Sequence, residues 1–178
     1  LNKMKSFALI SVYNKSKLNI LCDIFKKNNI GIISTGSTSL HIRKLGYKCI
    51  TVDKVTKFKE ILEGRVKSLH PHLYVSILFN RNKKKHLDQF TKIKIPLINY
   101  VIVNLYPFEK LNINKNTNEE FIEMIDIGGH TLLRASAKNY AHVNSICDPK
   151  DYKKLIQNIK KNNGKTDIKF REKMAAKI

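Results

Sequence analysis

Four short segments of the sequence combine cations, hydroxyls, glycines and a carboxylate in patterns that suit an anionic small molecule. The first, Ser34-Thr35-Gly36-Ser37-Thr38, stands between an expected strand and an expected helix. Free backbone N–H groups, hydroxyls and the helix dipole at such a turn suit a phosphate, although an ordinary helix cap has the same composition. Lys15, which follows the first expected strand, would add a positive charge, with an exposed lysine at a helix start as the alternative.

The second segment, residues 64–71, carries two cations within three residues. An extended backbone would put Arg65 and Lys67 on the same side and turn Val66 away, so that both cations face one ligand. The residue before Pro71 is held out of the α region, which helps to keep the segment extended. The alternative is a solvated basic loop.

Two further segments supply hydrogen-bond donors and a carboxylate. Tyr106 offers a phenolic hydroxyl beside the rigid turn at Pro107, with aromatic packing as the alternative. The glycines of Asp126-Ile127-Gly128-Gly129 would let the backbone approach a ligand and present N–H groups as an oxyanion hole, or would form only a structural turn. Arg134 and Lys138 share a face of the following helix, and a Lys beside an Asp in one site would form a proton relay.

Apolar periodicity indicates the elements that must position these segments. Strands are expected at residues 7–12, 31–34, 48–52, 97–105 and 143–147, and helices at 18–25 after an N-cap at Asn14, at 37–45, at 119–125 and at 130–138. Strands that alternate with helices predict an α/β fold with a mostly parallel sheet covered on both faces. Ligands gather at the carboxyl ends of such strands, where all four segments stand.

Composition narrows the class of protein. The chain has 178 residues, 42% of them hydrophobic, which fits one folded domain, and the polar segment 112–118 is expected as a loop within it. The net charge of +20 is spread along the chain as Lys together with Asn and Ile, which favours solvated faces over a nucleic-acid surface. A basic RNA-binding module remains the alternative of another class.

The cysteines and the apolar runs indicate a cytoplasmic protein without metal or membrane partners. Cys22, Cys49 and Cys147 are odd in number and lie in apolar stretches, so free thiols in a reducing compartment are expected. No metal-binding spacing joins them to the six histidines. No signal-like start or run of about 18 apolar residues is present.

Six motifs in order and spacing resemble the inosine-monophosphate (IMP) cyclohydrolase domain of the bifunctional purine-biosynthesis family. They are the segments 8–12, 34–36, 64–71, 104–108, 125–129 and 137–139. The resemblance implies a methylglyoxal-synthase-like three-layer α/β/α sandwich over residues 1–152, followed by a helical segment over 153–178 that starts the connection to a formyltransferase domain. It also implies dehydrative ring closure of the formylated carboxamide ribotide to IMP, without a cofactor; a folate would serve only the formyltransferase, and the full-length enzyme would be a homodimer.

The resemblance further implies a division of the site into two ends. We expect Lys67, Tyr106 and the amides near Ile127 and Gly128 to hold the formyl oxygen while Asp126 and Lys138 move protons. Substrate-binding residues would be Ser11, Lys15, Ser34, Gly36, Ser37 and Thr38 for the phosphate, with Arg65, Ser68 and Gly129 at the reacting end.

The sequence departs from the family pattern at the binding end. Ser37 stands where a second glycine is common, Tyr13 replaces a small polar residue, and Ser68 replaces Thr. The alternative within the same fold is methylglyoxal synthase or a regulatory phosphate-binding domain.

Overall fold

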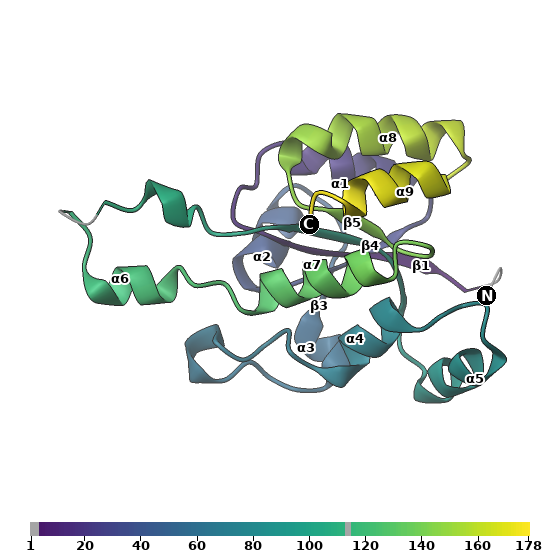
Figure 1. Cartoon of the computed structure of the whole chain (residues 1–178), viewed down its shortest axis with the longest axis horizontal. Helices are drawn as coiled ribbons and strands as arrows, with labels where there is room; N and C mark the ends of the chain where they lie inside the picture. Colours follow the sequence, from purple (N-terminus) through teal and green to yellow (C-terminus); the bar gives the residue numbers. More distant parts are fainter. Residues whose placement is uncertain (1–3, 113–114) are drawn as a thin grey trace.

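A five-stranded parallel sheet forms the centre of the computed structural model, which describes residues 4–112 and 115–178 (Figure 1). Residues 1–3 of the expected domain and 113–114 of the expected loop lie outside the described residues. The strand order is β3-β2-β1-β4-β5. The strands are β1 (Ser6–Val12), β2 (Gly31–Ser34), β3 (Ile50–Thr51), β4 (Leu97–Asn104) and β5 (Asn144–Ile146). The predicted parallel α/β sheet is confirmed.

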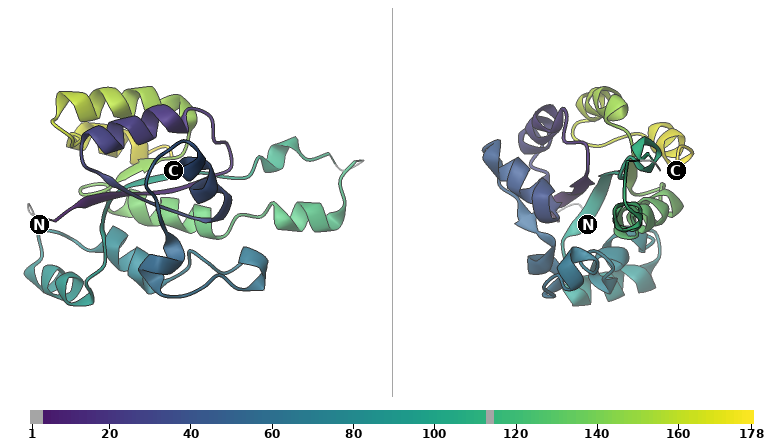
Figure 2. Two further views of the ribbon diagram at one scale, coloured as in Figure 1. Left: turned by 180° about the vertical axis from the view of Figure 1, so that it is seen from behind. Right: turned by 90° about the vertical axis from the view of Figure 1, so that its left-hand side faces the viewer.

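Helices cover both faces of the sheet and make the expected three layers (Figure 2). Because successive strand residues point to opposite faces, Ala8 and Ile10 join one core and Leu9 joins the other. The first core is closed by α1 (Leu18–Lys27), α2 (Gly36–Lys44), α8 (Tyr152–Lys161) and α9 (Ile168–Ala175). The second is closed by α3 (Val52–Thr56), α4 (Pro71–Leu78) and α7 (Gly128–Lys138).

A small third core lies under α5 (Lys84–Ile93), where Phe90 stacks on Phe79 with ring centroids 4.2 Å apart. The segment 153–178 is helical as expected and packs on the sheet, because Leu155 and Met174 are fully buried in the first core. These two helices therefore belong to the folded body.

Two expected element boundaries are wrong. The first helix begins after Lys17, whose φ is 60°, and Asn14 does not cap it; the Asn14 side chain instead accepts from the Ser16 amide at 2.9 Å. The third strand has two residues rather than five, because the chain enters α3 at Val52.

A long arm projects from the carboxyl edge of the sheet (Figure 1). Its described residues are 105–112 and 115–127, and they include the 3-10 turn η2 (Phe108–Lys110) and α6 (Asn118–Glu123), whose start is fixed by a capping box between Thr117 and Glu120. The loop between α3 and α4, with the 3-10 turn η1 (Leu62–Gly64), lies opposite the arm, and the Arg65–Glu123 ion pair joins the two.

Candidate functional site

A cavity of about 410 Å³ lies at the carboxyl ends of β1 and β4. The chain leaves β1 toward β2 and β3 on one side, whereas β4 and β5 lie on the other side, so this is the point where the strand order reverses. Loops diverge there and leave a crevice in which parallel α/β folds bind ligands. The N-termini of α2 and α7 and the loop before α4 form its walls.

Most of the predicted site residues line this cavity. They are Ser11, Lys15, Ser37, Thr38, Arg65, Lys67, Ser68, Tyr106, Asp126, Ile127, Gly128 and Gly129. Gly36 borders it, because a Cβ at Gly36 would lie 4.0 Å from the Lys67 ammonium nitrogen. The structure therefore brings together segments that lie more than a hundred residues apart in the chain.

One end of the cavity is the N-terminus of α2. In the described part of the chain, no side chain caps this helix, whose N-cap residue is Thr35. The Thr35 and Ser11 hydroxyls are hydrogen-bonded to each other at 2.9 Å, and the Lys67 ammonium lies nearby. Uncapped N–H groups, the positive end of the helix dipole and an ammonium group together suit a phosphate.

Two predicted phosphate-binding hydroxyls serve the fold instead. Ser34 is fully buried and donates to the carbonyl of Ile10 at 2.6 Å, so the structure does not bring its hydroxyl into the cavity. The Thr38 hydroxyl donates to the Val12 carbonyl at 3.0 Å and accepts from the Val12 amide at 3.2 Å. Thr38 therefore ties α2 to the end of β1, and only its backbone remains to face a ligand.

The other end of the cavity is the N-terminus of α7. The Asp126 carboxylate accepts from the Gly129 amide at 2.6 Å and caps the helix. A Cβ at Gly128 would overlap the Ser68 hydroxyl oxygen, and one at Gly129 would lie 2.7 Å from Asp126 Oδ2. The start of α7 therefore lies close against the Ser68 side chain of the loop before α4, and a side chain at Gly128 would displace the Ser68 hydroxyl.

The mouth of the cavity is crossed by an ion pair. Arg65 pairs with Glu123 of α6, and their side chains are 64% and 59% exposed. The hydrogen bond to Glu123 raises the pKa of Arg65. The expected extended backbone is wrong at Arg65, which adopts α-helical angles after η1. Arg65 and Lys67 nevertheless both line the cavity.

Tyr106 supplies the phenol expected from the sequence. Its ring packs edge-on against Tyr13, with centroids 5.5 Å apart and planes at 70°. Burial raises the pKa of Tyr106, and Asp126, Glu123 and Tyr13 raise it further. The hydroxyl therefore keeps its proton at neutral pH and acts as a donor.

Residues 18–131 of the chain match the family model described as the MGS-like domain. The chain belongs to this family. A second match follows it in the chain: residues 136–178 match the model described as the AICARFT/IMPCHase bienzyme.

Curated relatives agree with these matches. The bifunctional purine biosynthesis protein PurH of Clostridium kluyveri is 44% identical over 96% of this chain and 34% of its own length. PurH of Clostridium perfringens (strain SM101) is 42% identical over 98% of this chain and 35% of its own length. The chain thus spans about a third of the length of these relatives, and the resemblance to the bifunctional family is confirmed.

The fold is shared with a solved structure. The crystal structure of ForH superposes with a TM-score of 0.87 and 25% identity, covering 97% of this chain and 88% of that one.

Lys138 does not line the cavity that holds most of the other predicted site residues. It is the exposed last residue of α7, whereas Asp126 caps the first turn. Lys138 lies ten positions after Gly128 along the helix, which corresponds to a rise of about 15 Å along the axis. The expected Asp126–Lys138 proton relay is therefore not assembled in this structure.

Several lining residues were missed by sequence reasoning. Asn104 is the last residue of the buried strand β4, and this position at the carboxyl end of the strand is the signal that could have found it. The arm adds Ile122, Glu123 and Ile125, and the loop before α4 adds Glu63. No local pattern marks these residues, because their place in the cavity depends on how the arm and the loop face each other.

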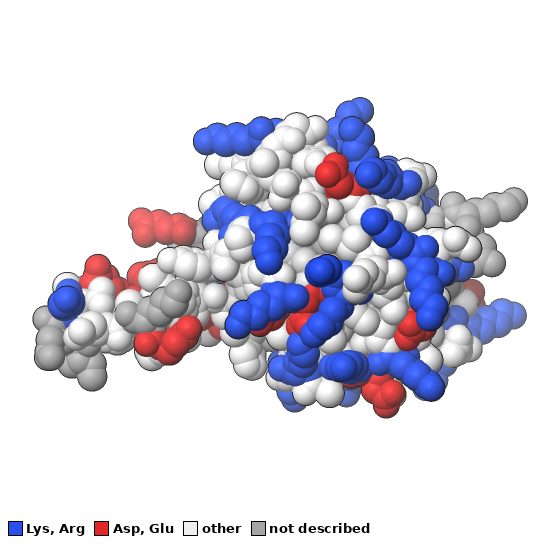
Figure 3. All heavy atoms as spheres, turned by 90° about the horizontal axis from the view of Figure 1, so that it is seen from above, with Lys and Arg blue, Asp and Glu red and all other residues white. Residues whose placement is uncertain are grey.

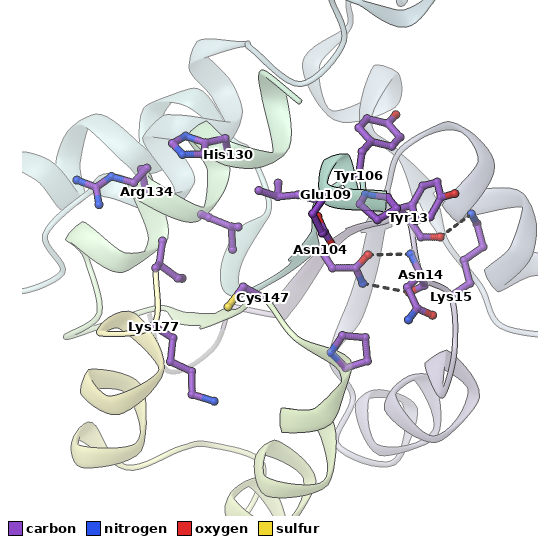
Figure 4. Close-up of a pocket in the computed structure, with 15 residues that line it drawn as sticks. Tyr13, Asn14, Lys15, Asn104, Tyr106, Glu109, His130, Arg134, Cys147 and Lys177 are labelled. Carbon is purple, nitrogen blue, oxygen red and sulfur yellow. Dashed lines mark hydrogen bonds between the residues drawn. The ribbon is translucent and has the colours of Figure 1, made fainter. Parts of the chain in front are cut away.

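A second, larger cavity of about 990 Å³ lies beside the first, toward β5 and the end of the chain (Figure 4). Tyr13, Lys15, Asn104 and Tyr106 line both cavities. Arg134, the partner of Lys138 in the i, i+4 pattern, lines only the larger one.

Two further findings concern the described residues alone. They hold no cluster of three or more metal-ligating side chains. None of their helices is both long enough and apolar enough to cross a membrane.

Proposed function

We propose that this domain closes the second ring of a purine nucleotide, converting 5-formamidoimidazole-4-carboxamide ribotide into IMP and water. The observation that carries the proposal is the single cavity with two different ends. An uncapped helix N-terminus suits the phosphate, and a second helix N-terminus beside Tyr106 suits a reacting carbonyl. The names of the curated relatives support the same reaction class.

In the proposed mechanism, the carboxamide nitrogen attacks the formyl carbon and a new C–N bond forms. Negative charge develops on the formyl oxygen, which Lys67, Tyr106 and the amides of Ile127 and Gly128 receive as donors. The Asp126 carboxylate accepts the proton from the attacking nitrogen. The formyl oxygen receives that proton and the proton of the formamide N–H. Its C–O bond then breaks as the ring C=N bond forms, and it leaves as water without a redox step.

The chain's residues also hold the reactants in the geometry that ring closure needs. Ser11, Lys15, Ser37 and the first amides of α2 are assigned to the phosphate, and Arg65 and Ser68 to the carboxamide end. Holding both ends restricts the substrate to conformations near attack, which supplies a large part of the rate enhancement in such reactions.

The proposal extends to the longer protein. This domain needs no cofactor for the cyclisation, whereas a formyltransferase domain elsewhere in a bifunctional chain would use a folate. We further propose that the full-length protein is cytoplasmic and homodimeric.

The decisive experiment is incubation of the purified 178-residue chain with the formylated ribotide, with IMP followed by absorbance and mass. The Lys67→Ala variant should lose about 100-fold in kcat, the usual effect of removing one donor to an oxyanion. The control is Lys84→Ala on α5, which lines neither cavity and should keep normal turnover. No acceleration over buffer by the unmodified chain would overturn the proposal, and conversion of dihydroxyacetone phosphate to methylglyoxal would favour the other activity of this fold.

A further inference from the structure

Tyr13 and Tyr106 line both cavities, and Figure 4 labels their side chains at the larger one. Their rings meet edge to face with centroids 5.5 Å apart. Tyr13 is 48% exposed and Tyr106 is 38% exposed, so neither ring is part of the buried core. The two cavities therefore share this pair of rings.

The backbone beneath the pair is held by a set of reciprocal hydrogen bonds. The Asn104 side chain accepts from the Asn14 amide at 2.8 Å and donates to the Asn14 carbonyl at 3.0 Å. The Tyr13 amide donates to the Asn104 carbonyl at 3.3 Å, and the Lys15 ammonium donates to the Tyr13 carbonyl at 3.3 Å. All contacts of Tyr13 in this set use its backbone, so changing its side chain leaves them in place.

We propose that Tyr13 is a positioning residue for Tyr106: its ring holds the Tyr106 hydroxyl toward the smaller cavity and separates it from the larger one. Tyr106 follows β4 by two residues and lies at the root of the projecting arm, beyond the last sheet hydrogen bonds. An aromatic neighbour in edge-to-face contact removes rotational freedom from such a ring. This inference rests on the function proposed above, in which Tyr106 donates to the formyl oxygen.

Kinetics of three variants test the inference. Tyr13→Ala should lower kcat about three- to tenfold, the range expected from loss of an aromatic pair, with KM changed less than about twofold. Tyr13→Phe keeps the ring and should retain normal kcat. Tyr140→Ala, which removes a similarly exposed tyrosine outside both cavities, is the matched control and should behave as the unmodified chain.

A double-mutant cycle shows whether Tyr13 acts through Tyr106. The variant carrying both Tyr13→Ala and Tyr106→Phe should be no slower than Tyr106→Phe alone, because the positioned hydroxyl is already gone. Additive losses, an effect of Tyr13→Ala on KM alone, or an equal loss in Tyr13→Phe would each overturn the inference.

A measurement independent of turnover separates this inference from the proposed function. Titration of the Tyr106 phenol near 295 nm, taken as the difference from Tyr106→Phe, should show a lower pKa in Tyr13→Ala than in Tyr13→Phe, because Tyr106 becomes more exposed. Asp126 and Glu123, which also raise this pKa, are present in both variants, as are the cations of the same cavity, Lys15, Arg65 and Lys67. Equal titrations would overturn the positioning role even in an active enzyme. If the pKa of Tyr106 is lower in Tyr13→Ala but the unmodified chain does not form IMP, the positioning role of Tyr13 is supported and the proposed ring-closing function is refuted.

Discussion

At the scale of single residues, hydroxyl groups that are close in the sequence have different tasks. Ser34 lies at the end of β2 with its hydroxyl buried against the Ile10 carbonyl. Ser37 lies three residues later on the exposed first turn of α2 and lines the cavity. One hydroxyl therefore stabilises the sheet, and the other faces the proposed phosphate.

A pair of alanine substitutions should separate these tasks. Ser34→Ala removes a buried donor, and we expect a loss of about 1 kcal/mol in the free energy of unfolding with KM for the ribotide unchanged. Ser37→Ala should leave stability unchanged and raise KM by about 10- to 100-fold, the value of one hydrogen bond to a charged group. Urea unfolding and steady-state kinetics on both variants measure the two effects, and the same pattern in both variants would contradict the assignment.

At the scale of elements, the site depends on how the start of α7 meets the loop before α4. The Ser68 hydroxyl occupies the space where a Cβ at Gly128 would lie. The end of α9 is fixed in a comparable way, because Lys177 pairs with the buried Asp151 of η3 (Pro149–Asp151). Each contact sets the position of a helix end relative to the sheet.

The contact at α7 predicts a compensating pair of substitutions. Gly128→Ala should cost about 1–3 kcal/mol of stability, because the new methyl group overlaps the Ser68 hydroxyl. Adding Ser68→Ala removes that oxygen and leaves only the Ser68 Cβ at 3.6 Å, an ordinary contact, so most of the stability should return. Chemical unfolding of the single and double variants measures this, and a double variant no more stable than Gly128→Ala would refute the packing argument.

The contact at Asp151 predicts a pH-dependent stability. Burial acts to raise the pKa of Asp151, but hydrogen bonds and charge from Lys177 and Lys154 outweigh it, so the pKa is lowered. A lowered pKa in the folded state stabilises the fold above the unfolded-state pKa of about 3.9, and this contribution is lost as the pH falls through the folded-state pKa. Asp151→Asn should therefore reduce stability at pH 7 by about 1–3 kcal/mol and by much less near pH 3. A difference that does not depend on pH would contradict this role.

At the scale of the whole molecule, charge is distributed unevenly. The chain carries 34 basic and 14 acidic residues, and five of the acidic residues lie in the arm over residues 105–127. Figure 3 shows Lys and Arg across the face of the body and acidic residues on the projecting arm. The basic surface is spread across the body, as expected for solvated faces, and the excess of like charge opposes the compact state.

Screening of this charge should stabilise the fold. Raising NaCl from about 0.01 M to about 0.1 M shortens the Debye length from about 30 Å to about 10 Å. We expect the Tm at pH 7 to rise by about 2–5 °C, measured by circular dichroism. The same rise is expected with KCl, because ionic strength is the cause; a fall in Tm would show that attractive surface pairs outweigh the repulsion.

The sequence by itself determined the class of fold and most of the cavity. Alternation of apolar strands and helices predicts a parallel sheet, and parallel strands present their carboxyl ends on one edge. Tyr106 and Asp126 could therefore be placed at one site from their positions in the chain. The same patterns missed α4 and α5: α4 is apolar at most positions and shows no single stripe, and α5 contributes only Phe90 to the buried core.

Only the tertiary structure decided which side chains meet. Periodicity reports which face of one element is buried, but not which end of it reaches a neighbour. Lys138 shares α7 with Gly128 but lies at the opposite end of that helix. Ser34 belongs to the predicted phosphate-binding turn, but its hydroxyl is bonded to the Ile10 carbonyl inside the fold. The Arg65–Glu123 pair and the Tyr13–Tyr106 contact join segments 58 and 93 residues apart in the sequence. Such contacts arise from packing across the whole molecule, which no local pattern records.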